Sequence, residues 1–508
     1  MSMCPPVSTT STSIEWINVK ENSAAPLQPP LCAAGDGHTD DTTAIQQCIT
    51  NAIALGGSGV VYLPPGTYQI TRPLTVDGPC TIMGLSGGAG GLAPPTLVMS
   101  SLSFNAIEVN ASDVLIRDLA IAGPTSGQTV TSSEGIGIHL TTNAVKGATI
   151  IDVSMTDVSN GVLIDGTSEV YCERVRVQPY AASTTKGDRF GFRAQGSGQV
   201  AEFLDCTVDE SPNTGNLQVT AAFDCMGAYT SFLVAQCVAL STYYGYRCST
   251  TGNFFFVANC LADSCYRGAF LDSGIAALIE ACRFSNNAYR GIEVSTNYTG
   301  SPISFANVVV DGSTDTGVDI SGGTPDQSIT FTGGAISNAG VDGMRIAVQG
   351  LLSVSGISIE ASSADGVHIL KTHSGTVALS GIVERGSGEF GLHVEDASGT
   401  YVTTGCSFSG DAVGSFSDAC VTPTRRCAST VGINPRGNLN QSPLVNTATQ
   451  NPFGVVASVY VSGAATKVEI GESPTALSDT QQTAGLFRVG VGEYIKVTGT
   501  ASWVWFGD

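Results

Sequence analysis

The sequence is poor in basic residues. Lys and Arg number 22 against 43 Asp and Glu in 508 residues, which gives a formal net charge of −21 at pH 7. Nucleic acid and anionic membrane surfaces both require a basic face on the protein that binds them. The charge balance therefore argues against nucleic acid and membrane partners. It also disfavours strongly polyanionic substrates unless a local basic patch receives them.

Long hydrophobic runs are also lacking. No stretch reaches the ~18 apolar residues of a membrane-spanning helix, so membrane insertion is not expected. The opening segment MSMCPPVSTTSTSIEW has no basic region followed by an apolar core, so no ordinary secretory signal is visible. Charged residues make up only 13 % of the chain, whereas Gly, Ser and Thr are abundant. This composition is typical of a turn-rich β architecture long enough for more than one domain.

Motifs for metal or cofactor binding are scarce. The sequence has no CxxC pair, P-loop or HExxH, and GLSGGAGG at 84–91 has no helical pattern after it. No cofactor or metal is expected. Calcium is an open alternative because Asp residues are numerous, but they do not have the spacing of an EF-hand. The 15 cysteines are an odd number. Spacings of 22 and 23 residues among them predict thiols stacked in the core rather than a disulfide framework. Cys420 and Cys427 lie in an irregular region and are the expected exception.

What the sequence does contain is a repeat. A glycine followed by alternating apolar and polar residues recurs at steps of 23 to 26 residues, at Gly245, Gly268, Gly291, Gly317, Gly343, Gly366 and Gly391. A fixed period of this size indicates a solenoid, and the two-residue alternation indicates strands. Three short strands and three turns fit in one such unit. The sequence therefore predicts a right-handed parallel β-helix with successive coils ~4.8 Å apart.

The alternation divides each repeat between core and surface. Residues one and three positions after the glycine are nearly all apolar, so we expect them inside; Tyr246 is one of them. The residue two positions after should face outward and form a ladder along the coils. That ladder reads Arg247, Phe270, Glu293, Asp319, Arg345, His368 and His393.

Composition shifts predict four segments. Residues 1–33 are rich in Ser, Thr and Pro and are interpreted as an arm or connector. The β-helix is predicted over 34–405, with a short helix after Asp40 and Asp41 that covers its open end and stops at Gly56. Residues 406–450 are interpreted as a linker. Residues 451–508 alternate without the period and predict a separate antiparallel β domain.

The opening of the predicted coil resembles a known superfamily. GDGHTDDT at 35–42, a helix and then GGSGVVYLPPGTYQI at 56–70 are similar to the start of pectate-lyase-like parallel β-helix proteins, in particular the branch of bacteriophage tailspikes and polysaccharide depolymerases. The resemblance implies a polysaccharide substrate, a homotrimer and an extracellular or virion-associated location. It supplies no catalytic residue, because GDGHTDDT is a structural motif.

Candidate chemistry lies on the outward ladder and the column beside it. Glycosidic hydrolysis needs two carboxyl groups across the scissile bond. Glu293 and Asp319 should form a close pair on neighbouring coils, and Asp319 with Asp342 a wider one, although an outward carboxylate is more often plain solvated surface. The residues expected to bind sugar, by stacking and hydrogen bonds, are Arg267, Arg290, Arg345, His368, Tyr244, Tyr266 and Tyr289.

Other functions stay open at this point. A lyase could use Arg290, Arg345 and His368 as base and cation. An intramolecular glycosyl transferase and a non-catalytic glycan-binding protein fit the same fold. A groove between subunits could instead draw on Asp188 and Asp263. Hydrolysis of a capsular or exopolysaccharide is the leading hypothesis, because paired acids outnumber clustered bases.

Overall fold

The chain divides into two compact units, 1–253 and 254–508. A computed structural model describes residues 15–21, 32–57, 59–85, 93–124, 134–142, 146–179, 189–211, 220–249, 254–274, 276–300, 302–395, 397–419, 426–428, 446–451, 457–490 and 492–507. Within this part, no helix combines the length and apolar character needed to cross a membrane. Each unit is described by itself below.

Unit 1 opens with two short strands and the helix α1 (Thr42–Ala54). The helix packs against β1 (Glu15–Asn18), β3 (Gly59–Leu63) and β5 (Leu74–Val76). Of the apolar positions that follow helical spacing it buries Ile45, Cys48, Ile49 and Ala52, whereas Ile53 is half-buried. Asp41 stands at the N-cap position without capping the helix through its side chain. Its carboxylate instead accepts hydrogen bonds from the amides of Ala34 and Gly35, at 2.6 and 3.1 Å.

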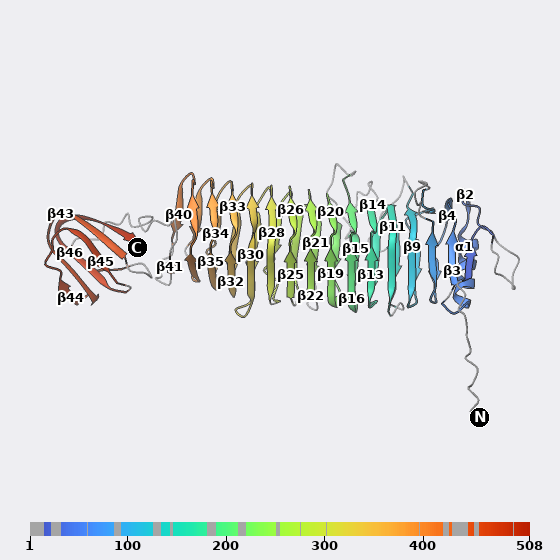
Figure 1. The fold of residues 1–508 in the computed structure, drawn as a ribbon, viewed down its shortest axis with the longest axis horizontal. Helices are drawn as coiled ribbons and strands as arrows, with labels where there is room; N and C mark the ends of the chain where they lie inside the picture. The colour runs from blue at the N-terminus through green and yellow to red at the C-terminus, as the bar shows by residue number, and fades with distance from the viewer. Residues whose placement is uncertain are drawn as a thin grey trace, which may run out of the picture. The chain divides into compact units, whose positions relative to one another are not determined.

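The remaining strands of unit 1 stack as parallel coils (Figure 1). One sheet has the order β5, β8 (Ile107–Val109), β10 (Ile136–Leu140), β12 (Asn160–Asp165), β15 (Arg189–Gln195), β18 (Thr220–Cys225), β21 (Tyr244–Ser249). The other strands are β2 (Asp36–Asp40), β4 (Thr67–Ile70), β6 (Thr81–Gly84), β7 (Thr96–Met99), β9 (Val114–Ala122), β11 (Ala148–Val158), β13 (Val170–Glu173), β14 (Arg176–Pro179), β16 (Ser197–Leu204), β17 (Thr207–Asp209), β19 (Ala228–Ala235) and β20 (Val238–Leu240).

Unit 2 repeats the same coil. One sheet, here called the site sheet, has the order β24 (Arg267–Ser273), β27 (Arg290–Val294), β29 (Val318–Gly322), β31 (Met344–Val348), β34 (Val367–Ile369), β37 (Phe390–Val394), β40 (Gly414–Asp418). The other strands are β22 (Phe254–Ala258), β23 (Leu261–Asp263), β25 (Ala276–Glu280), β26 (Arg283–Ser285), β28 (Ile303–Asp311), β30 (Ser328–Ser337), β32 (Leu351–Ser355), β33 (Ser358–Glu360), β35 (Thr376–Ser380), β36 (Val383–Arg385), β38 (Thr400–Thr404), β39 (Ser407–Ser409) and β41 (Arg426–Ala428).

Single residues with positive φ turn the chain at the corners of each coil. In one coil these are Ala281 and Asn286, both at φ 51°, which separate β25, β26 and β27. Asn tolerates this left-handed conformation better than most residues because its side chain bonds locally. Each coil therefore bends sharply twice without losing the parallel pairing of its strands.

The buried side chains of the coils follow the predicted alternation of apolar and polar residues. The residues one and three positions after the repeated glycines are all buried, including Tyr246, which was expected to point inward. The glycines are needed because adjacent coils approach closely at this column. A Cβ on Gly317 would lie 2.7 Å from the carbonyl oxygen of Gly343, and one on Gly343 would lie 2.6 Å from that of Gly366.

The described cysteines occupy the core as predicted, except Cys32, which is exposed. Cys225 pairs in register with Cys248, and both are buried thiols, as are Cys260 and Cys282. Burial raises the pKa of such thiols, as for Cys80, whose pKa is about 11. Cys420 and the side chain of Cys427 lie outside the described residues.

A separate antiparallel sheet follows in unit 2, as predicted. It consists of β42 (Thr449–Gln450), β43 (Ala457–Ser473), β44 (Ala476–Asp479), β45 (Gly485–Val489) and β46 (Tyr494–Gly507). Its core holds Val459, Val461, Val468, Phe487, Val489, Ile495 and Val497. The all-β class, the parallel coils, the single short helix and this sheet confirm the predicted fold. The segment boundaries at 33, 405 and 450 stay predictions; β1 lies before the first and β39 and β40 lie after the second.

Candidate functional site

The outward ladder exists on the site sheet of unit 2. Strand pairing places Glu293 beside Asp319, Asp319 beside Arg345, Arg345 beside His368 and His368 beside His393. We call these five residues the polar row. Parallel strands in constant register stack equivalent residues, which is why a sequence period became a continuous line of polar side chains.

A second line runs beside the polar row, one residue before each glycine. Arg267 pairs with Arg290 in it. Further along, the backbone carbonyls of Asp342 and Asp365 accept hydrogen bonds from the amides of Gly317 and Gly343, at 3.0 and 2.9 Å. The carboxyl groups of this second line therefore reach the side chains of the polar row.

Arg290 joins the carboxylates at one end of the site. Its guanidinium nitrogens lie 3.0 Å from Glu293, 3.2 Å from Asp315 and 3.1 Å from Asp319. Arg267 donates a short hydrogen bond to the other oxygen of Glu293. The predicted close pair of Glu293 and Asp319 is thus bridged by a cation, which offsets the repulsion expected between them.

Arg345 continues the network to the next coil. Its Nε donates to Asp342 Oδ2 at 2.9 Å, and its Nη1 lies 3.8 Å from Asp319 Oδ2. The two members of the predicted wider pair, Asp319 and Asp342, therefore share the guanidinium of Arg345. Both carboxylates are nearly enclosed, with exposed side-chain fractions of 2 % and 3 %.

The two carboxyl groups of this wider pair differ in acidity. Burial is the main cause that raises the pKa of Asp319, and the charge of Glu293 adds a small part. The hydrogen bond from Ser321 and the two neighbouring arginines act in the opposite direction without cancelling it. Desolvation rather than a like charge is therefore the chief cause of the raised pKa of Asp319.

Asp342 shifts the other way. Burial would raise its pKa, but the hydrogen bond and charge of His368, together with Arg345, lower it below the usual range. The same contacts affect the imidazole: burial would lower the pKa of His368, but Asp342, Asp365 and Glu395 raise it. Two carboxyl groups on one face thus have pKa values pushed apart, the pattern of an acid and base pair.

Aromatic rings flank the arginines. Tyr266 and Tyr289 stack with ring centroids 5.1 Å apart and planes 12° apart. The guanidinium of Arg267 lies over both rings, at 5.1 and 4.9 Å. Half-buried rings of this kind offer apolar faces and edges on which a sugar can stack.

Three other candidates are placed elsewhere. Tyr244 belongs to unit 1, where it packs on Tyr243 and beneath Arg247. Asp263 ends β23, outside the site sheet, and accepts a hydrogen bond from Asn286 at 2.9 Å. Asp188 lies outside the described residues.

The structure adds three acids to the predicted set: Asp315, Asp365 and Glu395. Asp365 carried a sequence signal, because it occupies the column of Arg267, Arg290 and Asp342. Asp315 and Glu395 carried none. Asp315 lies one residue before the second line and Glu395 two residues after the polar row, and both join the site only through their side chains.

A family model described as rhamnogalacturonase A/epimerase, pectate lyase-like, matches residues 31–220. Residues 31–220 are therefore similar to this family. The match begins at the GDGHTDDT region and confirms the superfamily resemblance of that opening. No curated protein matches the chain.

Several solved structures match this chain at low identity. The catalytic unit of a GH87 alpha-1,3-glucanase from Streptomyces thermodiastaticus is 14 % identical over 80 % of this chain and 70 % of its own, with a TM-score of 0.47. Tailspike protein 3 of bacteriophage CBA120 is 13 % identical over 86 % and 65 %, with a TM-score of 0.48. The N-terminal fragment of bacteriophage Phi29 gene product 12 is 11 % identical over 81 % and 80 %, with a TM-score of 0.49.

Proposed function

We propose that the site sheet of unit 2 binds a polysaccharide and hydrolyses its glycosidic bonds. The observation that carries the proposal is the pair Asp319 and Asp342 on one guanidinium, Arg345. One of these carboxyl groups is buried with a raised pKa, and the other is ion-paired at 2.9 Å. Glycoside hydrolysis requires a protonated acid and an ionised carboxylate on one face.

In this proposal Asp319 is the general acid and Asp342 the carboxylate that acts on water. Asp319 gives its proton to the glycosidic oxygen as the bond to the anomeric carbon breaks. Water forms the new bond to that carbon and gives its proton to Asp342, so one C–O bond is exchanged for another. Glu293 contacts Arg267 and Arg290 and supports the arginines rather than the reacting atoms.

Access to Asp319 requires movement of an arginine, because its side chain is only 2 % exposed. Arg290 contacts Asp319 at 3.1 Å and is itself 15 % exposed. Sugar hydroxyl groups that accept hydrogen bonds from Arg290 draw it from Asp319 and uncover the acid. In this way, binding of the substrate itself exposes the acid.

The charge balance of the site favours hydrolysis over elimination. A lyase needs a cation free to neutralise the uronate of its substrate. Here the guanidinium groups of Arg267, Arg290 and Arg345 all face carboxylates, namely Glu293, Asp315, Asp319 and Asp342. This arrangement suits a neutral or weakly acidic polysaccharide, such as a capsular or exopolysaccharide, that stacks on Tyr266 and Tyr289.

A lyase is the second candidate. The observation in its favour is that Arg345 and His368, two members of the lyase set, both contact Asp342 on the same face. In that reaction a side chain removes the proton next to a uronate carboxylate and the glycosidic bond breaks without water. An intramolecular glycosyl transferase and a glycan-binding adhesive protein are further outcomes of the same test.

Incubation with a panel of capsular, extracellular and plant polysaccharides tests the proposal. Hydrolysis produces new reducing ends without the ultraviolet absorbance of an unsaturated uronate. Reducing ends together with that absorbance would establish the lyase and overturn the hydrolase. Binding without any new ends would show an adhesive protein.

We further infer a virion-associated or extracellular setting and a homotrimer of tailspike type. The superfamily resemblance of the opening motif supports this inference, and the separate antiparallel sheet is the element available for trimerisation or for glycan binding.

A further inference from the structure

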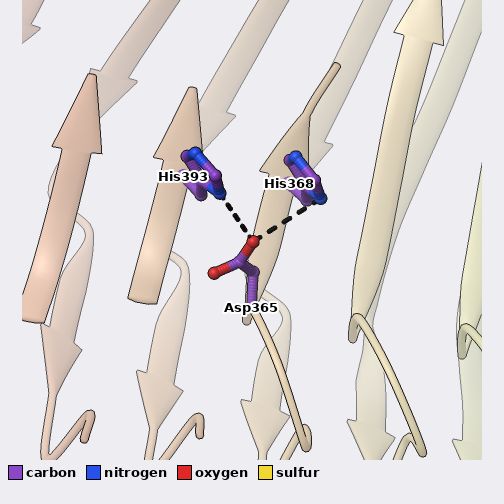
Figure 2. A group of neighbouring side chains, drawn as sticks. All are labelled: Asp365, His368 and His393. Carbon is purple, nitrogen blue, oxygen red and sulfur yellow. Dashed lines mark hydrogen bonds and ion pairs between the residues drawn. The ribbon is translucent and has the colours of Figure 1, made fainter. Parts of the chain in front are cut away.

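Two histidines and an aspartate converge beside the proposed catalytic pair. His368 on β34 and His393 on β37 are register partners, and their rings stack with centroids 4.6 Å apart and planes 5° apart. Both rings present Nδ1 to the same oxygen of Asp365, Oδ2, at 3.5 and 2.8 Å (Figure 2). Three potential ligand atoms therefore surround one small volume, all within 4.8 Å of one another.

We propose that Asp365, His368 and His393 bind a divalent transition-metal ion through Asp365 Oδ2 and the two Nδ1 atoms. Ligands at about 2.0–2.2 Å from an ion in near-tetrahedral geometry lie roughly 3–3.6 Å from one another. The two separations from Asp365 Oδ2 are close to this range, and the stacked rings must rotate on binding so that both Nδ1 lone pairs point at the ion. The inference does not depend on the proposed hydrolysis.

The ligands are held by a second layer of contacts. Asp365 Oδ1 accepts a hydrogen bond from the Phe390 amide at 3.1 Å, which directs Oδ2 toward the imidazoles. His368 Nε2 lies 3.3 Å from Glu395 Oε1. A carboxylate on the far nitrogen of a histidine orients the ring and strengthens its metal-binding nitrogen, an arrangement typical of metal sites.

The site is closed on the protein side and open on the outer side. Asp365 has only 3 % of its side chain exposed, whereas the two histidines have 15 % and 25 % exposed. An ion can enter from solvent and keep one position for water or a sugar oxygen. Three protein ligands with an open fourth position is the pattern of catalytic rather than structural zinc sites.

The donor set selects the class of ion. Two imidazole nitrogens and one carboxylate oxygen suit zinc, cobalt or nickel, whereas calcium and magnesium prefer oxygen ligands alone. The carboxylate of Asp342 lies 3.2 Å from His368 Nδ1 and adds negative charge beside the site. This proposal differs from the expectation of no metal, which was based on sequence motifs, because its ligands come from neighbouring coils.

Titration of the metal-free full chain with zinc chloride, followed by calorimetry, tests the site. We expect one ion per chain at this site, and a loss of affinity of about tenfold or more in His393→Gln and in Asp365→Asn. His393 is at the surface, so its variant should keep the wild-type circular dichroism spectrum. The matched control is His38→Gln, at an exposed histidine on β2, which should bind zinc as the wild type does.

Cobalt distinguishes these ligands from cysteine. Wild-type protein loaded with cobalt chloride should show visible absorption of a nitrogen and oxygen site that His393→Gln lacks, without thiolate charge-transfer bands. Equal zinc affinity in the wild type, His393→Gln and Asp365→Asn would overturn the proposal. Thiolate bands that persist in both variants would assign the ion to cysteines and also overturn it.

Discussion

At the scale of single residues, the site depends on opposing effects at buried carboxyl groups. Asp319 and Asp342 are both nearly enclosed and both contact Arg345. Asp342 additionally receives the imidazole of His368, and its pKa is lowered, whereas that of Asp319 is raised. At Asp319 burial outweighs the hydrogen bond from Ser321 and the charges of Arg290 and Arg345, whereas at Asp342 the contacts of His368 and Arg345 outweigh burial.

Asp319→Asn should abolish most cleavage while the fold persists. Asparagine keeps the shape of the side chain but cannot supply a proton, so we expect a loss in kcat of roughly 100- to 10,000-fold. Initial rates of reducing-end release measure it. Asp326→Asn, at an exposed turn carboxylate, is the matched control and should retain full activity. Wild-type rates in Asp319→Asn would remove this residue from the chemistry.

Glu384 provides a pH-dependent contribution to stability. Its side chain on β36 is fully buried, accepts a hydrogen bond from Ser387 at 2.6 Å, and lies near the carboxyl group of Asp411. Burial, with the charge of Asp411, raises the pKa of Glu384 from 4.5 to about 7. The folded protein therefore keeps a proton that the unfolded chain has released.

Because this pKa is raised on folding, the contribution is complete below pH ~4.5 and is lost as pH rises through about 7. We expect the free energy of unfolding to fall by about 2–3 kcal/mol over that interval from this group. Glu384→Gln should remove most of that slope, measured by urea unfolding at several pH values. An unchanged slope in the variant would show that Glu384 ionises alike in both states.

At the scale of elements, the glycine column sets how closely successive coils stack. A Cβ on any of the repeated glycines from Gly268 to Gly366 would meet the backbone carbonyl of the next coil, as for Gly317 and Gly343. The strands next to this column carry the polar row. The distance between successive coils therefore also sets the distance between neighbouring side chains of the polar row.

Gly317→Ala should destabilise the protein by about 1–3 kcal/mol, because the added methyl group meets Ile336 and the Gly343 carbonyl at 2.6 and 2.7 Å. Gly414→Ala is the control. A Cβ there meets only the Phe390 ring at 3.7 Å, so a change below about 0.5 kcal/mol is expected. Thermal unfolding of both variants gives the comparison. Equal melting temperatures would contradict the role of close coil contact.

The fold and the line of the polar row could be predicted from the sequence, because both follow from a period and constant register. The contacts within the site could not. Arg290 reaches acids on its own coil and the next, and that reach depends on side-chain torsions that no period encodes. Likewise His393 shares Asp365 with His368, although the repeat indicated only that the histidines stack.

At the scale of the whole molecule, assembly adds a prediction. The superfamily resemblance implies a homotrimer, so the full chain should have a mass near 3 × 52.0 = 156 kDa. Light scattering after size-exclusion chromatography measures this mass. A species of 52.0 kDa at all concentrations would show a monomer and would exclude a site shared between subunits.

The most direct test of the proposed hydrolysis is cleavage in water labelled with heavy oxygen, followed by mass spectrometry of the products. Attack by water places one labelled oxygen at each new reducing end, and Asp319→Asn should yield almost none of this product. Fragments with an unsaturated end and no label from cleavage would contradict hydrolysis, because they form by elimination without water.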